Sequence, residues 1–285
     1  MLYNPAIINH PVPFLMPSAT HSQTTTRAAI GVMDSGVGGI SVLRHVHALL
    51  PHEHIHYVAD SAHAPYGNKS AEEIKARCFA VADFLIEKQV KALVVACNTA
   101  TAAAIADMRT RYALPIIGME PAVKPAAAAT HNGVIGVLAT VGTLQSAQFA
   151  ALLESYGRNV KVVTQGCVGL VECIERGELD TPETQTLIRT YTAPLLAEGA
   201  DTIVLGCTHY PFVKPAIQDI VGSQITLIDT GAAVAKQLKN QLEEKDLLNP
   251  STAIAEVQFW TNSTAENAAQ VTEQLWGEQV EVHRI

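Results

Sequence analysis

Two short stretches of the chain each place a cysteine at the end of an apolar run and follow it with short polar residues. The first is VVACNTAT at 94–101, around Cys97, and the second is VLGCTHYP at 204–211, around Cys207. A single cysteine in such a place is usually a small core residue, but two in equivalent places favour a shared role. A thiol whose pKa is lowered by a histidine or a helix N-terminus can act as a base. One thiolate could remove a proton from a carbon acid while a thiol on the opposite face returns one.

Other uses of the two cysteines stay open at this point. In a reducing cytosol we expect free thiols rather than disulfides. A metal held by Cys97, Cys207 and His209 would lack further ligands at a recognisable spacing, and the sequence has no CxxC pair, so we expect no metal. Two other classes of protein compete with a two-base enzyme. One is a two-lobed binding protein for a small ligand, which needs no paired thiols, and the other is a thiol redox protein.

Strands and helices alternate along most of the chain, which is typical of parallel sheets with helices on both faces. Ser70 and Glu73 predict a capping box at the start of a helix over 71–89. The pattern then restarts, because IGVMDS at 30–35 resembles IGVLAT at 135–140. Likewise, VVACNT at 94–99 resembles VLGCTH at 204–209. We therefore predict an α/β fold of two pseudo-symmetric parallel-sheet units, each with a cysteine at a strand end.

Polar side chains follow several of the predicted strands. In open α/β sheets, ligands bind at the carboxyl ends of the strands, so these side chains are candidates for one site between the two units. They are Asp34, Ser35, Asp60, Cys97, Asn98, Thr99, Thr140, Cys207, Thr208 and His209.

The glycine-rich turn DSGVGG at 34–39 follows the first predicted strand. It lacks the glycine spacing and the lysine of nucleotide-binding loops, and Asp34 would repel a phosphate. We expect its glycines to let backbone N–H groups approach a small carboxylate at the start of the next helix.

Composition excludes several classes of function. The chain has 285 residues, of which 48% are hydrophobic and 16% charged, with a formal net charge of −8. An acidic chain without a basic cluster is a poor match for nucleic acid or an anionic membrane, and no apolar run is long enough to span a bilayer. Residues 1–26 contain prolines and no Lys or Arg, unlike a signal peptide. We read them as a flexible N-terminal extension and expect a cytoplasmic protein.

The order of the motifs resembles the glutamate racemases of the aspartate/glutamate racemase superfamily. The resemblance runs from residue 28 to about residue 235 through DSGVGG, ADSAHAPYG, ACNTAT, IGVLAT, GLVECIERG and GCTHYP. It implies cofactor-independent interconversion of L- and D-glutamate, which supplies D-glutamate for peptidoglycan synthesis. It also implies two α/β domains that face each other, the second inserted in the first. We expect residues 27–125 and 240–285 to form the first domain and residues 126–239 the second.

The resemblance also implies roles for individual residues. Cys97 would take the α-proton from D-glutamate, and Cys207 would take it from L-glutamate. Asp34 would assist the first thiol; His209 would assist the second and would itself be supported by Glu175. The implied substrate-binding residues are Asp34, Ser35, Tyr66, Gly67, Asn98, Thr99, Thr140, Thr143, Thr208 and His209.

Two further expectations concern partners and substrate. The lead of 27 residues before the first strand resembles an extended subgroup, some members of which are activated by UDP-N-acetylmuramoyl-alanine. A homodimer is left open. Within the same superfamily, an enzyme acting on aspartate or a hydantoin is the nearest alternative to one acting on glutamate.

Overall fold

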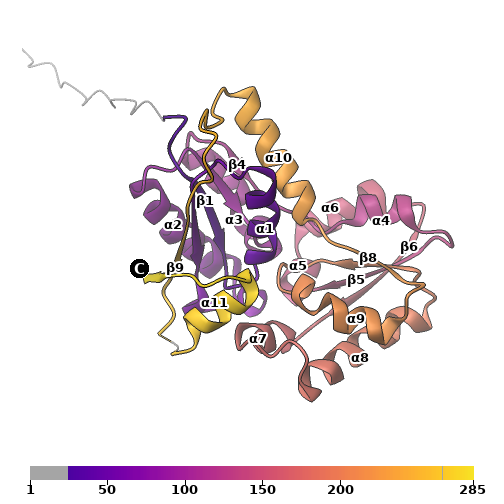
Figure 1. Cartoon of the computed structure of the whole chain (residues 1–285). Helices are drawn as coiled ribbons and strands as arrows, with labels where there is room; N and C mark the ends of the chain where they lie inside the picture. Colours follow the sequence, from indigo (N-terminus) through magenta and orange to yellow (C-terminus); the bar gives the residue numbers. More distant parts are fainter. Residues whose placement is uncertain (1–24, 265) are drawn as a thin grey trace, which may run out of the picture.

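The computed structural model of the chain describes residues 25–264 and 266–285, and the statements below concern these residues. Two all-parallel sheets form the centres of two lobes (Figure 1). The first lobe surrounds a six-stranded sheet in the order β10-β9-β2-β1-β3-β4, and the second lobe surrounds a four-stranded sheet in the order β6-β5-β7-β8. The strands are β1 (Ile30–Asp34), β2 (Ile55–Ala59), β3 (Ala92–Val95), β4 (Ile116–Ile117), β5 (Val134–Ala139), β6 (Lys161–Gly166), β7 (Thr202–Leu205), β8 (Thr226–Ile228), β9 (Val257–Thr261) and β10 (Val282–Arg284).

Helices cover the two sheets. Those around the first sheet are α1 (Ile40–Leu49), α2 (Ala71–Glu87), α3 (Asn98–Arg111), α10 (Gly231–Glu244) and α11 (Ala268–Trp276). Those of the second lobe are α4 (Val123–Ala129), α5 (Val141–Leu144), α6 (Ala147–Tyr156), α7 (Leu170–Glu175), α8 (Pro182–Ala197) and α9 (Lys214–Val221). Three short 3₁₀ turns complete the chain: η1 (Ser61–His63), η2 (Tyr66–Asn68) and η3 (Tyr210–Val213).

The two sheets share one strand order. The segment β2-β1-β3-β4 of the first sheet corresponds to β6-β5-β7-β8 of the second. The similar sequences at 30–35 and 135–140 supply β1 and β5, and those at 94–99 and 204–209 supply the ends of β3 and β7. The prediction of two pseudo-symmetric parallel-sheet units is therefore confirmed.

The central strands of both sheets are mostly apolar and buried because helices cover both faces. Every residue of β1, β3 and β7 is buried. Helix α2 begins where the sequence predicts, since the Ser70 side chain accepts a hydrogen bond from the Glu73 amide and the Glu73 carboxylate accepts one from the Ser70 amide. These rigid elements fix the positions of the loops that follow the strands.

The last strands of the chain join the first sheet. β9 pairs with β2, and β10 pairs with β9, both in parallel. The predicted domain boundary at residue 239 falls inside α10, and this helix packs along α1 of the first lobe. Of the predicted N-terminal extension, residues 1–24 lie outside the described residues.

Candidate active site

Both predicted thiols line one small pocket between the lobes. Cys97 lies two residues beyond β3 and Cys207 two residues beyond β7, so each follows the equivalent strand of its own sheet. The pocket is formed by residues of both lobes. It is lined by Ser35, Pro65, Tyr66, Gly67, Cys97, Asn98, Thr99, Thr140, Val171, Cys207, Thr208 and His209. The sequence predicts ten of these residues, and the structure brings all ten together.

The first thiol lies at the N-terminus of α3. The Cys97 Sγ accepts a hydrogen bond from the Ala100 amide at 3.4 Å and donates to the Ser35 Oγ at 3.7 Å. The Ser35 hydroxyl in turn donates to the Asp34 Oδ1 at 3.4 Å. Burial and the nearby Asp34 carboxylate raise the pKa of Cys97 well above its ordinary value. Ser35 therefore connects the thiol to the Asp34 carboxylate by two hydrogen bonds.

Asp34 lies behind Ser35 and does not line the pocket. Its Oδ2 accepts hydrogen bonds from the amides of Gly39 at 2.8 Å and Gly36 at 3.3 Å. Burial raises the pKa of Asp34 to about 6, although the charge of His209 and the hydrogen bond from the Gly39 amide act in the opposite direction. A carboxyl group with this pKa can exchange a proton near neutral pH.

The second thiol has a different support. The Cys207 Sγ lies 3.6 Å from the His209 Nδ1, and the His209 Nε2 lies 2.6 Å from the Glu175 Oε1. Burial alone would lower the pKa of His209, but its hydrogen bonds with Cys207 and Glu175 hold the pKa well above the ordinary value. The imidazole can therefore carry a proton beside the Cys207 thiol.

The glycines of the DSGVGG turn make room for this support. A Cβ on Gly36 would lie 1.9 Å from the Glu175 Oε1, and one on Gly38 would lie 2.2 Å from the His209 Nδ1. The sequence predicts that the backbone N–H groups of this turn approach a small carboxylate, and in the structure three of them donate to carboxylates. The carboxylates are the protein's own Asp34 and Glu175.

Three threonine hydroxyls meet across the two lobes. Thr99 of α3 lies 2.9 Å from Thr140 and 3.1 Å from Thr143, both at the start of α5, and Thr140 donates to Thr143 at 3.0 Å. A Cβ on Gly67 would lie 2.7 Å from the Thr140 Cβ, so this glycine lets the η2 turn approach the second lobe. The mutual hydrogen bonds satisfy these buried hydroxyls and leave them able to turn toward an anionic ligand.

Asn98 has an unusual environment beside the first thiol. Its side chain is buried, with 4% of the residue exposed, and neither its Oδ1 nor its Nδ2 has a hydrogen-bond partner. A buried amide without partners costs free energy. Because this amide lines the pocket, the unpaired Oδ1 and Nδ2 indicate that Asn98 binds a ligand there. Of the other predicted binding residues, Tyr66 donates through its hydroxyl to the Asp60 Oδ2 at 2.5 Å, and Thr208 accepts from the Ser41 Oγ through its carbonyl at 2.7 Å.

Sequence reasoning missed several residues around the pocket. Pro65 and Val171 line it, while Ser41 and Ser61 hydrogen-bond across the lobes to Thr208 and Glu175. For Ser61 and Pro65, the signal was their place within the ADSAHAPYG motif. Val171 carried the same kind of signal, since it lies within the GLVECIERG motif, whereas Ser41 lies in an ordinary helical pattern.

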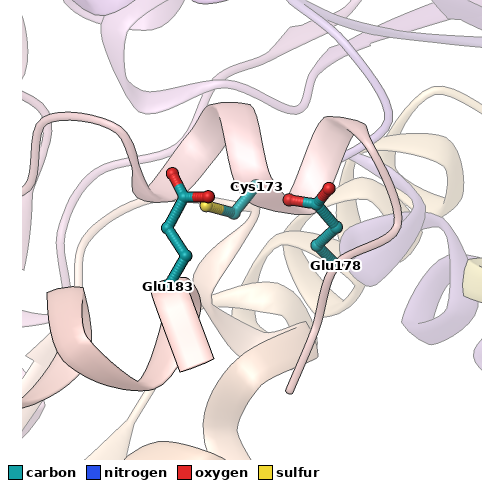
Figure 2. Close-up of side chains that lie close together, drawn as sticks. All are labelled: Cys173, Glu178 and Glu183. Carbon is teal, nitrogen blue, oxygen red and sulfur yellow. The ribbon is translucent and has the colours of Figure 1, made fainter. Parts of the chain in front are cut away.

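A second cluster of potential ligands lies outside the pocket. Cys173, Glu178 and Glu183 offer ligand atoms within 4.8 Å of one another, and Figure 2 shows their side chains coming together. The Arg176 guanidinium already donates to Glu178 at 2.6 Å and lies 3.6 Å from the Glu183 carboxylate. This arrangement is an ion-pair cluster, because a cation already occupies the position that a metal ion would need.

The comparison with known proteins agrees with this fold. Residues 30–238 match the Asp/Glu/Hydantoin racemase family, and the chain belongs to this family. It is 56% identical over 259 residues to the glutamate racemase of Ectopseudomonas mendocina, covering 90% of this chain and 98% of that protein. It is 54% identical to the glutamate racemase of Pseudomonas aeruginosa over 259 residues, which cover 90% of this chain and 97% of that protein.

Solved structures give the same result. Glutamate racemase isoform RacE1 from Bacillus anthracis superposes with a TM-score of 0.83 at 34% identity, covering 91% of this chain and 98% of that chain. The Escherichia coli glutamate racemase, solved with L-glutamate and the activator UDP-MurNAc-Ala, superposes with a TM-score of 0.80 at 29% identity over the same shares. Among the described residues, no helix has the length and apolar character needed to cross a membrane.

Proposed function

We propose that the chain interconverts L- and D-glutamate by two-base catalysis without a cofactor. The observation that carries this proposal is the presence of two buried thiols in one pocket, at equivalent strand ends of two lobes that face each other. The names of the relatives at 54–56% identity support glutamate as the substrate. An aspartate racemase, from Picrophilus torridus, is only 17% identical and shares the fold alone.

The chemistry of each step follows from the two supports. With L-glutamate bound, the Cys207 thiolate takes the α-proton, so the Cα–H bond breaks and its electron pair stays on the substrate. The Cys97 thiol then gives its proton to the opposite face of the same carbon, which yields D-glutamate and a Cys97 thiolate. The reverse direction exchanges the two roles, and the resting state returns when Cys97 regains a proton and Cys207 loses one. His209 and the Ser35–Asp34 pair are placed to exchange those protons.

The substrate carboxylates would be held by neutral donors. None of the residues lining the pocket is Lys or Arg. We assign this binding to the hydroxyls of Ser35, Thr99 and Thr208, the Asn98 amide and the Thr140–Thr143 pair, because hydrogen-bond donors fixed in a closed pocket stabilise developing negative charge better than water does. Tyr66 and Gly67 shape the pocket wall beside Thr140.

The remaining expectations from the sequence belong to the same proposal. We propose a cytoplasmic enzyme that supplies D-glutamate for peptidoglycan synthesis and so acts in cell-wall formation and cell shape. We also retain the discontinuous first domain, since β9 and β10 complete the first sheet. Sedimentation or light scattering tests whether the chain forms the homodimer that its sequence leaves open. Adding UDP-MurNAc-Ala, the activator in the E. coli structure, tests whether this chain responds to it.

One assay tests the central proposal. The purified protein is incubated in deuterated water with L-glutamate and, separately, with L-aspartate, without added cofactor. We expect L-glutamate to lose its optical rotation while deuterium enters at Cα, with little change in L-aspartate. No exchange with either amino acid would overturn the racemase assignment, whereas preferential exchange of aspartate would reassign the substrate.

A further inference from the structure

The Glu175 carboxylate accepts hydrogen bonds from both lobes. It belongs to α7 of the second lobe, where its Oε1 lies 2.6 Å from the His209 Nε2. The same oxygen accepts from the Val37 amide at 2.7 Å, and its Oε2 accepts from the Ser61 hydroxyl at 3.0 Å. Both of these donors belong to the first lobe. The acid–base group beside Cys207 is thus completed only where the lobes meet.

We propose that Ser61 is a positioning residue that links contact between the lobes to the proton held on His209, acting through Glu175. This inference rests on the racemase function proposed above. Ser61 touches neither thiol; its effect is exerted on the carboxylate that holds the imidazole.

The surroundings of Ser61 hold its hydroxyl in place. Its neighbour Asp60 is fully buried and accepts two hydrogen bonds from the Arg77 guanidinium, at 2.9 and 2.6 Å. The amide of Ala62 donates to the Asn262 Oδ1 at 2.9 Å, which ties the η1 turn to the segment after β9. Because the residues on both sides of Ser61 are fixed by hydrogen bonds, its hydroxyl can stay oriented toward Glu175.

The direction of the effect follows from charge. A donor at the Oε2 of Glu175 takes up part of the carboxylate's negative charge, so the carboxylate holds the His209 proton less firmly. Without the Ser61 hydrogen bond, and also when the lobes separate, the Glu175 carboxylate attracts the protonated His209 imidazole more strongly. Contact between the lobes would therefore weaken the hold of Glu175 on the His209 proton. His209 would exchange its proton more readily when the pocket is closed than when it is open.

Other ionisable groups face the same pair and must be held constant in a test. Asp34 interacts electrostatically with both Glu175 and His209, and Tyr57 with Glu175. Cys207 contacts His209, and Cys97 faces Cys207 across the pocket. Replacing Ser61 by alanine leaves all of these groups in the chain.

The test compares Ser61→Ala, Ser61→Thr and a matched control. Ser41→Ala also removes a hydroxyl that bonds across the lobes, to the Thr208 carbonyl at 2.7 Å, but it leaves Glu175 untouched. For Ser61→Ala we expect kcat/KM for glutamate to fall about tenfold, the typical effect of losing a hydrogen bond to a charged group. We also expect the alkaline limb of the pH profile, where His209 loses its proton, to move to higher pH. Ser61→Thr should restore both, and Ser41→Ala should leave this limb in place.

A second measurement separates this inference from the proposed function. In substrate-free protein labelled with ¹⁵N-histidine, the His209 imidazole should titrate at higher pH in Ser61→Ala than in the unmodified chain. An unchanged titration and pH profile, or an equal shift in Ser41→Ala, would overturn the role of Ser61. Absence of glutamate turnover in the unmodified chain would overturn the racemase proposal instead, and the imidazole titration would still decide the role of Ser61.

Discussion

The Sγ of Cys207 lies 3.6 Å from the Nδ1 of His209, whereas the Sγ of Cys97 has Ser35 as its side-chain partner, at 3.7 Å. The two thiols therefore occupy equivalent places in the fold and differ in the groups that hold them. One is paired with an imidazole whose own pKa is held well above its ordinary value. The other reaches a buried carboxyl group through a hydroxyl, and burial keeps it protonated. The two thiols therefore differ in the group with which each can exchange a proton.

Cys97→Ser and Cys207→Ser should each abolish racemisation, with a loss of at least about a thousandfold, because a hydroxyl is a far weaker acid than a thiol and cannot replace the catalytic base. Polarimetry with each enantiomer measures the loss. Cys78→Ala is the control, since Cys78 is also buried in the first-lobe core but does not line the pocket. Full racemase activity in either serine variant would refute the two-base mechanism.

Gly38→Ala should lower kcat by about a hundredfold, the typical cost of displacing a catalytic group by about 1 Å. The added Cβ would lie 2.2 Å from the His209 Nδ1 and would push the ring away from Cys207. Gly166→Ala is a suitable control, since its Cβ would meet a methyl group of the exposed Val141 side chain at 3.0 Å, and that side chain can move aside. Equal activity in the two variants would show that the glycine-rich turn does not constrain His209.

Asp34→Asn should change how stability depends on pH. The folded-state pKa of Asp34 is raised from 3.8 to about 6, so its contribution to stability is fully present below pH 3.8 and is lost as the pH rises through about 6. The neutral asparagine lacks this loss. Relative to the unmodified chain, the variant should therefore gain about 2 kcal/mol of unfolding free energy between about pH 4 and about pH 7. Urea unfolding at both pH values measures the difference, and parallel pH curves would contradict the raised pKa.

Asn98→Ala should separate binding from stability. The Asn98 amide is buried without a partner, so removing it relieves a cost of about 1–3 kcal/mol, which offsets the lost packing. We expect an unchanged or higher melting temperature together with a KM for glutamate at least about tenfold higher. A large loss of stability with an unchanged KM would show that Asn98 is a structural residue.

The sequence predicted those parts of the site that depend on local pattern. Cys97 and Cys207 could be paired because each follows an apolar strand in a repeated motif, and parallel strands bring their carboxyl ends to one edge. Asp34 was visible for the same reason. The glycines of DSGVGG could also be recognised from the sequence. The side chains that they accommodate could not, because the proximity of Gly36 to Glu175 and of Gly38 to His209 depends on how the two lobes are arranged.

Contacts between the lobes could not be predicted in this way. Ser61 and Glu175 are 114 residues apart, and Ser41 and Thr208 are 167 apart. No periodicity within one element encodes such a pair, since it depends on how the two lobes are oriented. The same limit explains why α10 packs along α1 although the sequence pattern continues the second unit up to residue 239.

The unequal support of the two thiols has a thermodynamic consequence for any racemase. L- and D-glutamate have the same free energy in water, so the ratio of kcat/KM in the two directions must equal unity for the unmodified chain and for every variant. The His209–Glu175 side and the Ser35–Asp34 side can therefore make kcat or KM differ between the enantiomers, but only in compensating amounts. A substitution on either wall of the pocket must slow both directions by the same factor in kcat/KM. The equilibrium constant of unity thus fixes equal kcat/KM values for the two directions, although the two thiols have chemically different supports.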